Sequence, residues 1–267
     1  MSLQPITRKS LSDDVFDQLA QEILVGRFVA GSTLPSEREL AEALQVNRGA
    51  VREAMMRLSQ AGLVDSRHGS GTHVLDYRRS AGLELLPRLL FAADGDIDLP
   101  LVRSVLEMRS ALGPDVARAA ALRRNSRWVE LLQRKVLQHE EAAHSLDLQQ
   151  QVAIEYWDVL VDASGNIAYR LAYNSLRSVY VLVREAMAQV LADEIRDNAR
   201  LRQLTQAVAE GDATTAAEVA RALCERGRRG VEQAFAMLDL DQDAAPEAGP
   251  GSDDDTATAA GHQEVQR

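Results

Sequence analysis

The sequence predicts a mainly α-helical protein with two folded parts, and three observations support this. Ala, Leu, Val, Arg and Glu dominate, whereas aromatic residues make up only 4%, a composition that favours helices. Apolar residues recur at helical spacing along most of the chain, and short strands are indicated only near residues 63–75. With 267 residues, 46% of them hydrophobic, the chain can bury one or two cores. We expect a winged helix-turn-helix joined to an antiparallel helix bundle.

The first part begins with three short helices. Apolar residues spaced as on one helical face predict a helix at residues 11–25. Ser36 stands three residues before Glu39, a capping-box arrangement that opens a second helix through residue 44. Asn47 can cap a third helix, which ends near Gly62.

Two short strands are predicted to follow the third helix. They cover residues 63–66 and 72–75, and the connecting loop contains Gly69 and Gly71. Three helices followed by a hairpin form a winged helix-turn-helix, in which the third helix is the one that enters the major groove of DNA.

Beyond Arg79 the hydrophobic pattern is helical throughout, which predicts an antiparallel bundle. The expected helices are 80–92, 98–123, 126–145, 147–163, 166–195, 197–210 and 213–237. We assign residues 1–78 to the DNA-binding domain and 79–238 to a helical effector-binding and dimerisation domain. Residues 76–80 are expected to act as the hinge between them.

The charge is distributed unevenly along the chain. Its formal net charge is -10, yet residues 1–79 hold ten basic and ten acidic side chains. Residues 239–267 hold eight acidic residues, one arginine and few large apolar side chains, so we expect a disordered acidic tail. The acidity is therefore concentrated away from the first part and does not argue against DNA binding there. The tail could weaken DNA binding by repulsion, but a solubilising extension is the commoner role.

Several classes of protein are disfavoured. Cys224 is the single cysteine, so no intrachain disulfide can form. The N-terminus lacks the apolar core of a signal peptide, and no later segment runs about 18 residues without a charge, as a membrane span would need. We expect a cytoplasmic protein without membrane contact. No Ser/His/Asp set, phosphate loop or paired carboxylates indicate an enzyme.

The start of the third helix carries the chemistry of DNA recognition. Arg48 and Arg52 are one helical turn apart and share a face, and Gly49 and Ala50 are small enough to allow close approach to DNA. Arginine can bond guanine through two parallel hydrogen bonds. The alternative is that both arginines only solvate a surface helix, with Arg52 paired to a neighbouring glutamate.

The segments LPSERELAEALQVNRGAVREAMMRLSQAGLV and RHGSGTHV resemble the DNA-binding half of GntR-family bacterial transcription factors. The resemblance covers residues 11–75. It implies DNA contacts at Arg38, Asn47, Arg48, Gly49, Arg52, His68 and Gly69. The family usually has other residue types, including a hydroxyl residue, where this chain has Asn47, Gly49 and Ala50, so its operator preference does not transfer in detail.

The second part is similar to the FadR-type effector domain through LEMRSALGPDVARAAA and YWDVLVDASGN. Many members of that branch hold a metal with one Asp and three His. The matching positions here are Ala153, Trp157, Leu201 and either Leu223 or Cys224, which do not form a ligand set. We therefore expect no metal and no other cofactor. The three histidines His139, His144 and His262 are expected at the surface or at helix ends.

Further local resemblance is to the metal-free, fatty-acid-responsive members of this branch. It rests on SAGLELLPRLL, on Tyr156 ahead of the ASGN run and on Tyr180. Long-chain acyl-CoA or a fatty acid is the effector that this resemblance implies. The predicted effector-binding residues are Arg109, Tyr156, Trp157, Tyr173 and Tyr180.

Other interpretations of these residues stay open. Aromatic side chains on bundle helices are often core or dimer contacts, and Arg109 could pair with Glu107, Asp115 or Glu155. An alternative effector is a small organic carboxylate bound by Arg109 without metal. An architectural DNA binder without a ligand is a further possibility.

The function expected from the sequence is that of a ligand-responsive transcriptional regulator, usually a repressor. As a homodimer it would bind a palindromic double-stranded operator, because two recognition helices related by a twofold axis read two half-sites.

Overall fold

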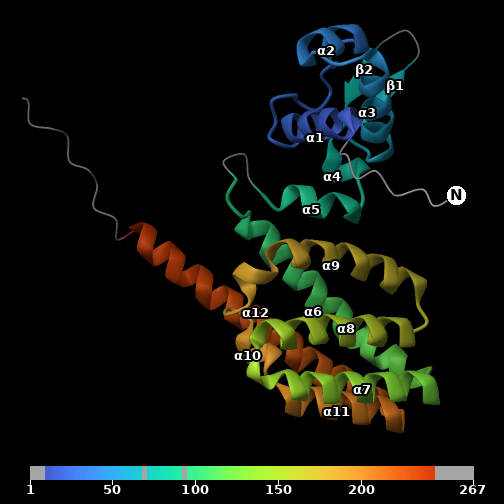
Figure 1. The fold of residues 1–267 in the computed structure, drawn as a ribbon, viewed down its shortest axis with the longest axis vertical. Coiled ribbons are helices and arrows are strands. Elements are labelled where there is room, and N and C mark those ends of the chain that lie inside the picture. The colour runs from blue at the N-terminus through green and yellow to red at the C-terminus, as the bar shows by residue number, and fades with distance from the viewer. Residues whose placement is uncertain (1–9, 68–70, 92–94, 244–267) are drawn as a thin grey trace, which may run out of the picture.

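The computed structural model describes residues 10–67, 71–91 and 95–243. Two helical parts are joined by the short helices α4 (Tyr77–Ser80) and α5 (Leu86–Leu89), which lie between them (Figure 1). The predicted fold class is confirmed: a small winged part precedes an all-α bundle. None of the helices in these residue ranges is long and apolar enough to cross a membrane.

The winged part has the predicted three helices and hairpin. Ser36 accepts a hydrogen bond from the Glu39 backbone while the Glu39 carboxylate accepts one from the Ser36 backbone, which confirms the capping box. The side chain of Asn47 accepts a bond of 2.9 Å from the Ala50 backbone and caps the third helix. The elements are α1 (Leu11–Leu24), α2 (Glu37–Leu44), α3 (Arg48–Gln60), β1 (Val64–Arg67) and β2 (Gly71–Val74).

The two strands form an antiparallel pair in which Val64 lies opposite Val74. Both valines are buried, at 1% and 2% exposure, and they close one side of the core formed by α1 and α3. Val51 and Leu58 face the same core from α3. The apolar side of α3 therefore fixes this helix on the domain and leaves its opposite face outward.

The bundle surrounds a second core in which α6 runs alongside α12 and α7 alongside α8 (Figure 1). Leu132, Leu160 and Leu204 are fully buried there. Its helices are α6 (Leu99–Leu122), α7 (Ser126–Glu141), α8 (Leu146–Ala163), α9 (Ile167–Met187), α10 (Ala192–Ile195), α11 (Asn198–Glu210) and α12 (Ala213–Asp243), with a short 3-10 helix η2 (Ala142–His144).

Two of the predicted helices are interrupted. Within the described part of residues 80–92, η1 (Leu83–Leu85) and α5 (Leu86–Leu89) follow the last residue of α4, and Pro87 stands in the first turn of α5, where a residue without a backbone N–H is tolerated. The helix expected at 166–195 ends at Met187 and the chain turns into α10. That turn buries Leu191 and Ile195 against the bundle, so tertiary packing outweighs helix propensity here.

The segments predicted as the hinge and as the start of the tail are helical. Residues Tyr77–Ser80 form a short helix, α4, which Asp76 caps. Helix α12 continues to Asp243 and projects beyond the bundle (Figure 1), so the first five residues assigned to the tail are helical. The remainder of the predicted tail lies outside the described residues.

Candidate DNA interface and effector cavity

The N-terminal turn of α3 presents the predicted DNA-contact residues to solvent. Asn47, Arg48, Gly49 and Arg52 are all exposed. Arg48 and Arg52 lie one helical turn apart on the exposed side of α3, next to the side that buries Val51 and Leu58. Gly49 is also small for a local reason, since a Cβ there would lie 3.0 Å from the capping Asn47 Oδ1. The arrangement suits a helix end that approaches DNA closely.

Of the remaining predicted DNA-contact residues, Arg38 lies within the described residues. The Arg38 side chain on α2 is 66% exposed, and its Nε lies 4.0 Å from Glu42 Oε1, so it remains accessible to a phosphate. His68 and Gly69 lie outside the described residues. Arg57, by contrast, pairs with Asp13 and stacks 4.4 Å from the Phe16 ring, which gives it a structural role in the core.

A cavity of about 140 Å³ lies in the bundle, with an almost entirely apolar lining contributed mainly by α6, α8 and α9. It brings together four of the five predicted effector residues: Arg109, Trp157, Tyr173 and Tyr180. The fifth, Tyr156, does not line the cavity: it is fully buried in the core, and its hydroxyl lies 3.0 Å from Thr205 Oγ1. Adjacent residues of a helix point about 100° apart, so Trp157 faces the cavity and Tyr156 does not.

The positions that carry metal ligands in related domains also meet at this cavity. Ala153, Trp157, Leu201 and Leu223 line it, and none of these side chains can coordinate a metal. Cys224 is fully buried beside them, and burial raises the pKa of its thiol to about 11. The described residues contain no group of three or more His, Cys, Asp or Glu that could hold a metal ion. The donor set therefore does not fit a metal.

Arg109 is held by a residue that lies far away in the sequence. Its Nη1 donates to Glu194 Oε2 at 2.9 Å and its Nη2 donates to Glu194 Oε1, so the contact is bidentate. Its guanidinium also lies 5.8 Å from the Trp157 ring. Burial disfavours the charge, but the carboxylate outweighs this and raises the pKa of Arg109 above its usual value. The partner is none of the three expected acids.

Gly227 on α12 provides the space for this ion pair. A Cβ at this position would lie 1.8 Å from Glu194 Oε2 and 3.2 Å from Arg109 Nη1. A larger residue would therefore displace the carboxylate from the guanidinium.

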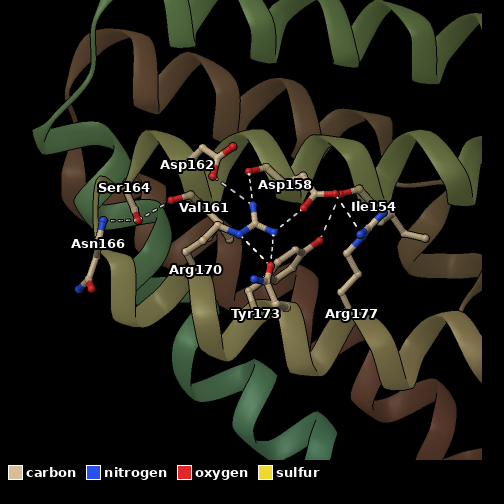
Figure 2. Close-up of polar contacts among 10 residues, drawn as sticks. Ile154, Asp158, Val161, Asp162, Ser164, Asn166, Arg170, Tyr173 and Arg177 are labelled. Atoms are coloured by element: carbon tan, nitrogen blue, oxygen red, sulfur yellow. Dashed lines mark hydrogen bonds and ion pairs between the residues drawn. The ribbon is translucent and has the colours of Figure 1, made fainter. Parts of the chain in front are cut away.

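A second polar cluster joins α8 to α9 at the edge of the cavity. Arg170 donates to Asp158 at 2.7 Å and to Asp162 at 3.1 Å, and Arg177 lies 3.3 Å from Asp158 (Figure 2). The hydroxyl of Tyr173 donates to the Ile154 carbonyl at 3.2 Å, and burial raises the pKa of this tyrosine. These contacts fix the wall that Tyr173 and Arg177 contribute.

Of the two described histidines of the bundle, His139 departs from the expected surface position, whereas the exposed His144 agrees with it. His139 is fully buried, and its Nδ1 lies 2.6 Å from Asn198 Oδ1. Burial lowers the pKa of His139, so this ring is neutral over a wider pH range than a free histidine. His144 is exposed beside the end of α7, where its Nδ1 lies 3.1 Å from the Glu141 carbonyl oxygen. His262 lies outside the described residues.

The sequence did not point to Glu194 or Gln150 as residues of this site. Gln150 lines the cavity and is spaced by three and seven residues from Ala153 and Trp157, so helical periodicity could have placed it on the same face. No such signal exists for Glu194, because it reaches Arg109 only through the packing of α10 on the bundle.

Comparison with known proteins agrees with both parts of the fold. Residues 11–74 match the family of bacterial regulatory proteins called gntR, and residues 104–226 match the FCD domain. The HTH-type transcriptional regulator Mce2R of Mycobacterium tuberculosis is 43% identical over 231 residues, which cover 84% of this chain and 93% of that protein. A fatty acid metabolism regulator protein of Edwardsiella ictaluri is 31% identical over 167 residues, 62% of this chain and 68% of that protein.

A solved structure shares the fold at low sequence identity. It is that of Lar, described as controlling the expression of the Listeria monocytogenes agr system, with a TM-score of 0.53 and 16% identity over 85% of this chain and 99% of that one. The family assignment rests on the sequence relatives, because their alignments cover most of this chain and most of each relative. The chain therefore belongs to the GntR family of bacterial transcriptional regulators and combines its helix-turn-helix domain with an FCD effector-binding domain.

Proposed function

We propose that the protein is a ligand-responsive repressor that binds a palindromic operator as a homodimer and releases it when a long-chain acyl-CoA or fatty acid enters the bundle cavity. The apolar lining of that cavity is the observation that carries the proposal. The similarity to a fatty acid metabolism regulator supports the same class of effector.

On the DNA side, the proposal assigns base reading to the first turn of α3. Arg48 and Arg52 are exposed on one side of the helix there, and its buried apolar residues anchor it on the domain. Arg38 and the wing, including His68 and Gly69, would contact the phosphate backbone or an adjacent groove and set the register. Asn47 serves as the helix cap and would in addition lie near the DNA.

For the homodimer, the exposed face of α9 is the candidate contact surface. Ile167, Leu171, Val181 and Leu182 are 52–72% exposed. At about 100° per residue they fall within about 100° of one another around the helix. Exposed apolar side chains gathered on one face are typical of an interaction site. A second copy is the occupant that a palindromic operator requires.

On the effector side, the cavity links to the DNA-binding part through α9. Pockets for drug-sized ligands are commonly about 300–1,000 Å³, so a long chain must widen the present cavity. Helix α9 forms one wall and also contacts η1 and α5, the segment between the two parts. Widening would therefore shift the winged domains. A ligand changes DNA affinity only by favouring one arrangement over the other.

The second candidate effector is a small organic carboxylate bound by Arg109. The position of Arg109 in the cavity lining favours it. Against it stands the bidentate contact with Glu194, because an incoming carboxylate would have to displace the one already bound.

The first experiment is a calorimetric titration of the full-length protein with palmitoyl-CoA in the presence of a chelator. We expect saturable binding near one ligand per protomer, and release of operator DNA over the same concentration range. No binding by the folded protein would overturn the lipid effector. Competition by a small organic acid alone would support the second candidate.

A further inference from the structure

Gln150 is a buried polar residue in the mostly apolar lining of the cavity. Its residue exposure is 1%, and its Oε1 has no hydrogen-bond partner. Of the cavity-lining residues that the structure describes, Gln150 alone carries such a buried, unpartnered side-chain atom. A buried acceptor without a donor is costly in a folded protein, which makes this oxygen a place where a ligand donor would be stabilising.

The orientation of the Gln150 amide follows from its neighbours. Its Nε2 donates to the Arg184 carbonyl oxygen at 3.0 Å and to the Tyr180 hydroxyl at 2.7 Å. The carbonyl can only accept, so the nitrogen must face it and the amide cannot be reversed. Because the Tyr180 oxygen accepts from Gln150, its own proton can be donated elsewhere. The pair therefore offers one acceptor and one donor.

The charged residues of the lining are already neutralised. Both oxygens of Glu194 accept from Arg109, and Arg177 lies 3.3 Å from Asp158 (Figure 2). An anionic ligand head would have to separate one of these pairs. In the case of Arg109 this would leave the Glu194 carboxylate, whose side chain is 11% exposed, without its partner.

We propose that Gln150 and Tyr180 form the polar recognition point of the cavity and select an effector whose buried polar end is uncharged, such as an amide or a hydroxyl, over a carboxylate. An amide N–H would donate to Gln150 Oε1 while its carbonyl accepts from the Tyr180 hydroxyl. The inference rests on the proposed function, namely that the cavity is the effector site. It favours an acyl thioester with its adjoining amide over an ionised fatty acid.

The test is calorimetry on the full-length protein at pH 8 with three ligands of equal chain length: decanamide, decan-1-ol and decanoate. We expect the two uncharged ligands to bind about tenfold or more tightly than decanoate, because burying an unpaired charge opposes binding. Equal or tighter binding of decanoate would overturn the inference but leave the apolar effector cavity in place. If none of the three ligands binds and palmitoyl-CoA does not bind either, both this inference and the proposed function of the cavity are overturned.

Two variants assign the selectivity to the residues. Gln150→Leu removes the amide at similar volume, and Tyr180→Phe removes only the hydroxyl; each should reduce the preference for decanamide over decanoate by several fold. Gln149→Leu is the matched control, because Gln149 is also buried, at 2% exposure, but lies outside the cavity lining and bonds the His139 carbonyl. It should keep the wild-type preference.

The comparison also separates recognition from folding. If Gln150→Leu fails to fold, Tyr180→Phe still tests the donor half of the pair. An unchanged preference in the folded Tyr180→Phe variant, or an equal change in the Gln149→Leu control, would overturn the role assigned to the pair.

Discussion

Leu85 and Leu90 are five residues apart in the sequence and lie in two different hydrophobic cores. Leu85 is 3% exposed in the core of the winged part, and Leu90 is fully buried against the bundle residues Val102 and Val179, which also line the cavity. The segment around α5 is therefore packed on both sides at once. A movement of the cavity wall can therefore be transmitted to the DNA-binding part through this short segment.

The ion pair between Arg88 and Asp17 should contribute to this coupling. Arg88 Nη1 lies 2.6 Å from Asp17 Oδ1 on α1, and its guanidinium lies 4.5 Å from the Phe16 ring. We expect Arg88→Ala to leave effector affinity and basal operator affinity within a few fold of wild type, but to reduce the loss of operator affinity that the effector causes. Operator titrations with and without palmitoyl-CoA measure this loss, as the ratio of the two operator affinities. Arg118→Ala, which removes an ion pair within the bundle, is the control and should not change it.

The recognition helix is tested by Arg48→Ala. Because Arg48 is exposed and its loss removes no core contact, the variant should fold normally. A bidentate contact to guanine is worth about 1–3 kcal/mol, and the homodimer loses one in each half-site, so operator affinity should fall by at least about thirtyfold. Binding is measured on an operator selected from random DNA with the wild-type protein. Arg27→Ala, a 70% exposed arginine of the same domain, should bind normally. Wild-type affinity in Arg48→Ala would refute the assignment of α3.

The dimer surface on α9 is tested by Leu171→Glu. Leu171 is 60% exposed, so the substitution should not disturb the protomer core, but it would bury a charge in the proposed contact. We expect light scattering to show a shift from dimer to monomer at micromolar concentration. Leu137→Glu on α7, where the leucine is 58% exposed, should remain dimeric. A monomeric wild-type protein would contradict the prediction outright.

The space beside the Arg109–Glu194 pair is tested by Gly227→Ala. The new Cβ would collide with Glu194 Oε2, so we expect a loss of about 1–3 kcal/mol in the free energy of unfolding. In a Glu194→Ala background the collision is absent. There the same substitution should be neutral or stabilising by up to about 1 kcal/mol, because alanine favours helix over glycine. Urea unfolding of the four proteins measures the difference. Equal losses in both backgrounds would mean that the collision is not the cause.

Buried His139 predicts a pH dependence of stability. Burial lowers its pKa in the folded state, although Asn198 and Glu140 favour the charged form. As the pH falls below about 6.5, the unfolded chain takes up a proton at this residue and the folded chain does not, so stability decreases with decreasing pH. Urea unfolding midpoints between pH 8 and pH 5.5 should change less in His139→Gln than in wild type. His144→Gln, at an exposed histidine, should follow the wild-type curve.

The sequence alone determined the winged part and the family. The capping signals at Ser36, Glu39 and Asn47 act over three residues, and the apolar spacing of α1 and α3 repeats over a few turns. Such local interactions depend on residues a few positions apart, so the sequence pattern alone can predict them. The same holds for the exposure of Arg48 and Arg52, which follows from the buried side of their helix.

The tertiary structure decided the content of the cavity. Arg109 and Glu194 are 85 residues apart, and their contact depends on the turn after Met187 and on the absence of a side chain at Gly227. Sequence order also could not decide that Trp157 faces the cavity while Tyr156 lies in the core. The burial of these residues, the pairing of their charges and the free acceptor of Gln150 all depend on how separate helices pack together. That packing is determined by contacts between residues far apart in the sequence, so a local sequence pattern does not predict it.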